Sequence, residues 1–222
     1  MRYYTIVDGA GVIKADDQKD PIRLALTVFD DDVRQYERRD CDTENSVDEE
    51  AFAKQIEGNG GSPPEATTLI AVGSGTTFAL DTLAALAKRA SSALATRNYE
   101  PFVQLILVAP DCATGEFIET ADGLSRGALA ARVCHRIVVL YADNGGLTPM
   151  RGELAGTLGL WGPTGKSFDG VLALDVSALL IGHRSDVGAY LESLEVLGII
   201  ARAAGGASNE TLRRFARRGA DQ

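Results

Sequence analysis

The hydrophobic positions of this chain fall into short continuous runs that are separated by polar or helix-patterned stretches. The runs that have the length and β-branched composition of strands are 2–7 (RYYTIV), 22–29 (IRLALTVF), 67–73 (TTLIAVG), 101–110 (PFVQLILVAP), 136–142 (RIVVLYA) and the start of 171–180 (VLALDVSALL). Continuously apolar strands are typical of a parallel sheet that is covered on both faces. The pattern therefore predicts an α/β protein with a mostly parallel, doubly wound sheet and helices on both faces.

The stretches between these runs carry helical signals. In 46–56, Ser46 is followed three residues later by Glu49, the spacing of a capping box. After 67–73, one apolar stripe at helical spacing is formed by Ala79, Leu83, Leu86 and Ala90. Residues 115–132 indicate one or two short helices, and 186–206 predicts a single helix that ends at glycine.

A chain of 222 residues is long enough for one sizeable core, so a single domain is expected. We assign it to residues 1–206, with 30–62 as an acidic cap or insertion-like region and 207–222 as a basic C-terminal tail or helix. The polar stretch 58–65 (GNGGSPPE) predicts a loop that is too short to be a domain linker.

Polar residues with chemical potential stand where the predicted strands end. Ser74 lies in a glycine turn between a strand and a helix, Asp143 follows a later strand, and His183 follows the last one. Serine, acid and histidine in this order are the arrangement of α/β-hydrolases. In that chemistry the histidine takes the serine proton, the acid fixes the histidine tautomer, and a backbone N–H at the helix start stabilises the oxyanion.

Several phrases in sequence extend this likeness: LIAVGSGTTFALDTL, LILVAPD with Phe117 six residues beyond Asp111, RIVVLYADNGGL, GLWGP and DVSALLIGH. From the first strand to about residue 190 the chain resembles a family of uncharacterised bacterial α/β-hydrolase proteins. That family has, in the same order, a strand leading to HSMG, APD, a tyrosine strand leading to NDxAL, LGxxGP, and a valine-rich strand leading to GH. The resemblance implies an α/β-hydrolase fold.

The resemblance also implies that the nucleophile position is degenerate. With Ala71 and Gly75 aligned to the family's A-H-S-M-G, Gly73 occupies the position of the serine and Ser74 falls one residue late. Centring GxSxG on Ser74 would need small residues at 72 and 76, which are valine and threonine. A side chain one residue later on a helix points about 100° away.

Two further positions depart from the family pattern. In the alignment, the family's catalytic acid corresponds to Asn144, which cannot support the charge of the histidine as Asp would. Asp143 takes that position only if the alignment is shifted by one residue. The family's HG after the opening strand is Asp8-Gly9 here, and a carboxylate beside a developing oxyanion opposes it. Only His183 stands as in the family.

These positions favour a fold that has lost serine-hydrolase chemistry and serves as an interaction or structural subunit, or as a non-catalytic ligand binder. The alternative is an active ester hydrolase of the esterase or lipase kind that uses Ser74, His183 and Asp143. A third reading is an unrelated small-molecule binder in which the GSGT turn holds an anion at a helix N-terminus.

Charge adds an expectation about partners. The chain has a net charge of −9, so we expect no nucleic-acid partner, because a phosphate-backbone binder needs a basic face. The charge is uneven: residues 30–57 are acidic and the C-terminus carries Arg213, Arg214, Arg217 and Arg218. These regions predict a protein partner or a homo-oligomer, against the simpler interpretation of two solvated faces.

The cysteine and histidine content limits which disulfides and metal sites the chain can form. The cysteines, Cys41, Cys112 and Cys134, are odd in number and widely spaced, and only His135 and His183 are available as imidazole ligands. We therefore expect no disulfide framework, no metal site and no cofactor, although carboxylate-only magnesium binding stays open. The chain has no apolar run of membrane-spanning length and no signal-peptide pattern, so a cytoplasmic protein is expected.

Overall fold

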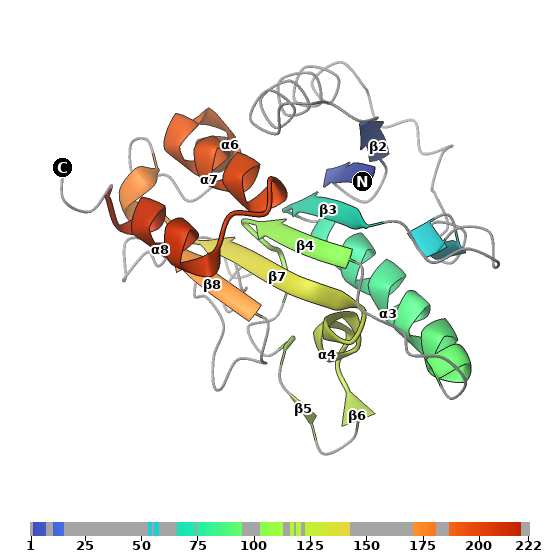
Figure 1. The fold of residues 1–222 in the computed structure, drawn as a ribbon. Coiled ribbons are helices and arrows are strands. Elements are labelled where there is room, and N and C mark those ends of the chain that lie inside the picture. Colours follow the sequence, from blue (N-terminus) through green and yellow to red (C-terminus); the bar gives the residue numbers. More distant parts are fainter. Residues whose placement is uncertain are drawn as a thin grey trace.

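The chain folds around one mixed sheet, and the computed structural model describes residues 2–7, 11–15, 53–54, 56–57, 66–73, 75–94, 103–112, 116–117, 119–120, 123–142, 171–180 and 187–218. The six-stranded sheet has the order β2-β1-β3-β4-β7-β8 (Figure 1). Its strands are β1 (Arg2–Val7), β2 (Gly11–Ala15), β3 (Thr67–Val72), β4 (Val103–Val108), β7 (Cys134–Tyr141) and β8 (Val171–Asp175).

The sheet is parallel except at one edge. Strands β1, β3, β4, β7 and β8 pair in parallel, and only β2 runs antiparallel, to β1. The predicted strands that fall on described residues are confirmed, and so is the α/β class. The predicted strand 22–29 lies outside the described residues. The sequence did not predict β2 (GVIKA), which follows the turn signal after β1 and is too short to stand out as an apolar run.

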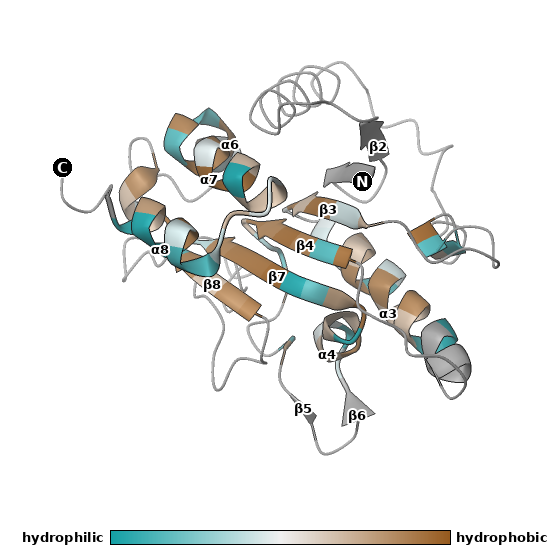
Figure 2. Cartoon of the chain, viewed as in Figure 1, coloured by the Kyte–Doolittle hydropathy of each residue, from teal (hydrophilic) through white to brown (hydrophobic). Residues whose placement is uncertain are grey.

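Alternating residues of the strands face separate hydrophobic cores. Leu69, Leu105 and Val139 face one core, and their neighbours Ile70 and Ile106 face the other. Because successive side chains of a strand point to opposite faces, a strand buried on both faces is apolar along most of its length. Figure 2 shows β4 and β7 as hydrophobic along most of their length.

The first face is covered by α3 (Gly75–Leu94) and α4 (Arg126–Ala131). The predicted stripe is confirmed where it is described, because Ala79, Leu83 and Leu86 are fully buried on this face. Residues 53, 54, 56 and 57 are helical, which agrees with part of the predicted helix 46–56. Ala53 and Ile56 join the same core, and Glu57 forms an ion pair with Arg89 of α3.

The second face is covered by α6 (Val187–Glu192), α7 (Leu194–Ala204) and α8 (Asn209–Arg218). The prediction of a single helix over 186–206 was wrong, because the helix breaks at Ser193. The Ser193 hydroxyl accepts a hydrogen bond from Val196 N (3.3 Å), as a helix N-cap does, and donates to Leu179 O (2.7 Å). The predicted glycine stop is confirmed, since Gly205 directly follows α7.

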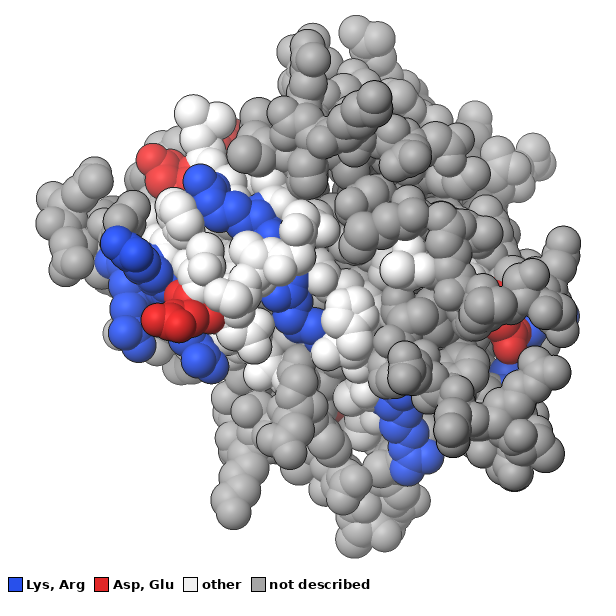
Figure 3. Space-filling view, in the orientation of Figure 1, with Lys and Arg blue, Asp and Glu red and all other residues white. Residues whose placement is uncertain are grey.

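The C-terminal stretch predicted as a tail or helix contains α8, which packs onto β8 and α7. Leu212 and Ala216 are buried in the second core, and the Arg202 guanidinium of α7 lies 3.9 Å from the centroid of the Phe215 ring. The opposite side of α8 exposes arginine side chains to solvent (Figure 3).

Two polar side chains on the second face of the sheet, Gln104 and Arg136, form hydrogen bonds with helix α7. Gln104 of β4 is buried, and its Nε2 donates to Ala203 O (2.6 Å). Arg136 of β7 donates to the same carbonyl (2.7 Å), to Gln104 Oε1 (2.8 Å) and to Ala207 O. The last carbonyls of a helix have no partner within the helix, so a cation there satisfies them and also opposes the negative end of the helix dipole.

We expect Arg136→Met to lower the free energy of unfolding by roughly 1–3 kcal/mol, because it leaves Gln104 Oε1 and Ala207 O without the donor that Arg136 provides. Urea denaturation followed by circular dichroism measures the change. Arg132→Met is the matched control, since Arg132 is exposed and should change stability by less than about 0.5 kcal/mol. Equal effects of the two substitutions would contradict the role given to Arg136.

Candidate functional site

The candidate site is the edge of the sheet at which the parallel strands end, because function gathers at the carboxyl ends of such strands. The described residues at this edge come directly after β3, β4, β7 and β8. Of the residues singled out in the sequence, Gly73 lies among them. The others, Ser74, His183, Asp143, Asn144 and Asp8, lie outside the described residues.

Gly73 forms the turn from β3 into α3 and has a left-handed backbone, with a φ of 54°. Its N–H donates to Val108 O (3.0 Å), and its carbonyl accepts from Thr76 N (3.2 Å) and Asp111 N (3.2 Å). Both backbone polar groups are thus paired, which fixes the turn between the neighbouring strand and the first turn of the helix. α/β-Hydrolases, whose catalytic residues follow the chain order serine, acid, histidine, hold their nucleophile in a sharp, strained turn between a strand and a helix. Gly73 lies in a left-handed turn at the corresponding place after β3.

The end of β4 has a second left-handed residue. Ala109 has a φ of 47°, although its side chain disfavours that conformation, and its N–H donates to Leu140 O (3.1 Å). Asp111 is exposed and contributes its backbone N–H to the Gly73 turn. The loops after β3 and β4 are therefore fixed to each other through the backbone.

The end of β8 carries a carboxylate that the sequence analysis did not single out. Asp175 Oδ1 accepts hydrogen bonds from the backbone N–H (2.9 Å) and the hydroxyl (2.6 Å) of Ser177. The pKa of Tyr190 in α6 is raised, first by burial and then by the Asp175 carboxylate, while a backbone hydrogen bond with Ala142 acts in the opposite direction. Tyr190 therefore stays protonated beside the ends of β7 and β8.

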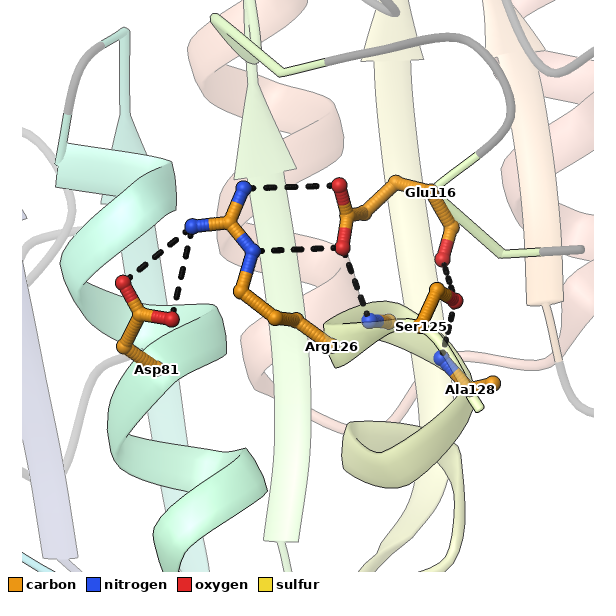
Figure 4. Close-up of polar contacts among 6 residues, drawn as sticks. Asp81, Glu116, Ser125, Arg126 and Ala128 are labelled. Carbon is orange, nitrogen blue, oxygen red and sulfur yellow. Dashed lines mark hydrogen bonds and ion pairs between the residues drawn. The ribbon is translucent and has the colours of Figure 1, made fainter. Parts of the chain in front are cut away.

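A charged cluster lies beside the loop that follows β4 (Figure 4). Arg126, the first residue of α4, donates to Glu116 (3.3 and 3.4 Å) and to both carboxylate oxygens of Asp81 in α3 (3.3 and 3.1 Å). Ser125 caps α4 through Ala128 N (3.2 Å) and donates to Glu116 O. The cluster ties the loop to both helices of the first face, so its role here is to hold the edge in place.

Glycine is required at position 127 for a close approach. A Cβ atom there would lie 2.6 Å from Glu116 O and 2.8 Å from the ring of Phe117, which is buried. The Gly127 N–H also donates to the Glu116 carboxylate (3.3 Å). The loop carrying Glu116 thus packs directly against the first turn of α4. Between this loop and α4 the chain forms a small two-stranded ribbon of β5 (Glu119–Thr120) and β6 (Gly123–Leu124).

Cys112 follows the same edge but is not a reactive thiol. Its side chain is buried, and its pKa is raised to about 12 by burial and by the nearby carboxylates of Glu116 and Asp111, with Arg126 opposing them. Burial also raises the pKa of Cys134 at the start of β7. Only the thiolate is nucleophilic, so both groups are inert at neutral pH.

The described part of the chain offers no grouping of His, Cys, Asp and Glu side chains that could hold a metal ion. Among the same residues, no helix is both long and apolar enough to cross a bilayer.

Comparison of the chain with models of known protein families, with curated proteins and with solved structures gives no match. The likeness to α/β-hydrolases therefore rests on the sequence phrases and their order along the chain.

We expect Gly73→Ala to lower the free energy of unfolding by about 1–2 kcal/mol, because alanine is strained in a left-handed backbone. Gly73→Asn is the matched comparison and should cost less, since asparagine tolerates this conformation better. Urea denaturation of both variants measures the difference. An alanine variant as stable as the wild type would contradict the left-handed turn.

We expect Cys112 to react with iodoacetamide at pH 8 at least about 100-fold more slowly in the folded protein than after unfolding in urea. Peptide mass spectrometry gives the rate at this cysteine separately from the others.

Because the pKa of Cys112 is raised on folding, its thiol stabilises the fold below about pH 9, and this contribution is lost as the pH rises towards 12. Cys112→Ala should therefore reduce the loss of stability above pH 9, and an unchanged pH profile would contradict the assignment.

Proposed function

We propose that this chain is an α/β-hydrolase-like scaffold, doubly wound, that has lost serine-hydrolase chemistry and acts as an interaction or structural subunit or as a non-catalytic ligand binder. The observation that carries the proposal is the left-handed backbone of Gly73, directly after β3. This is the position that the sequence resemblance assigns to the nucleophile, and glycine has no side chain with which to attack a substrate.

The arrangement of the turn supports the same reading. In a nucleophile elbow, the residue in the strained conformation is the one that is lifted clear of the sheet. That conformation belongs to Gly73, with α3 beginning at Gly75, so Ser74 is one residue further towards the helix.

The sheet supports the scaffold part of the proposal. Strands β3, β4, β7 and β8 are successive neighbours, so the loops after β3 and β7 start from strands that are separated only by β4. At a strand spacing of about 4.8 Å, these loops begin roughly 10 Å apart. The sequence places Asn144 and His183 in the loops that follow β7 and β8, and Asn144 and Asp8 add their own departures from the hydrolase pattern.

A fluorophosphonate probe, which labels activated serines covalently, tests the proposal directly. We expect no labelling of the purified wild-type protein above the level of the Ser74→Ala variant, because the left-handed position of the turn belongs to Gly73, which has no hydroxyl. Gly73→Ser is run in parallel to ask whether a serine at the turn restores labelling. A heat-unfolded sample serves as the control for non-specific reaction.

Labelling of the wild type that disappears in Ser74→Ala would overturn the proposal. It would then favour the alternative of an active ester hydrolase with Ser74 as nucleophile, His183 as base and Asp143 as acid. In that case His183→Ala should also abolish labelling, since an isolated serine hydroxyl is a poor nucleophile without a base.

A further inference from the structure

We draw no further inference here: the strongest candidate, the surface patch of exposed arginines that Arg213, Arg214 and Arg217 form on helix α8, carries nothing because nothing in the structure shows what covers it.

Discussion

Strands β3 and β4 contain no residue that reaches solvent, and this burial on both faces determines most of the fold. A polar side chain along them costs free energy unless its polar groups are satisfied, and most of their residues are apolar. Gln104 is the exception in β4, and it is tolerated because Arg136 and the end of α7 supply its partners. The hydrogen bonds between Gln104 and Arg136 thus satisfy a polar side chain buried in β4, and the bonds of both residues to Ala203 O also fix the position of α7 on the sheet.

The carboxyl edge of the sheet is shaped by hydrogen bonds that continue one residue beyond each strand. Gly73 bonds to Val108, Ala109 bonds to Leu140, and Val176 N donates to Tyr141 O (2.8 Å). Two of these residues adopt left-handed conformations, so the chain leaves the sheet sharply at adjacent strands. At the first of these turns the chain has a residue without a side chain, Gly73. The proposed function rests on this separation between a fold and the side chains that its edge carries.

The sequence predicted β3, β4 and β7 because continuous apolar runs are the direct mark of burial on both faces, and it also predicted β1 and β8. It missed β2, whose short run includes Lys14, and it missed the break at Ser193, which depends on a hydrogen bond to Leu179 from another element. At the site, the phrase around Gly73 was readable because it is local. The contacts among Asp81, Glu116 and Arg126 were not, since these residues come together only through the packing of α3 against α4.

The order of the strands has a consequence for how the chain folds as it is made. Among the described strands of the six-stranded sheet, β3, β4, β7 and β8 follow one another in chain order and are also neighbours across the sheet, so each can pair with its predecessor in that sheet as it leaves the ribosome. Helices α3 and α4 cover the first face during this growth. In the part of the chain that the structure describes, the helices that cover the second face, α6, α7 and α8, all come after β8. Before these helices have been synthesised, Ile70, Ile106 and Val138 lack the helices that bury them in the folded protein, and apolar surface of this kind is what chaperones bind.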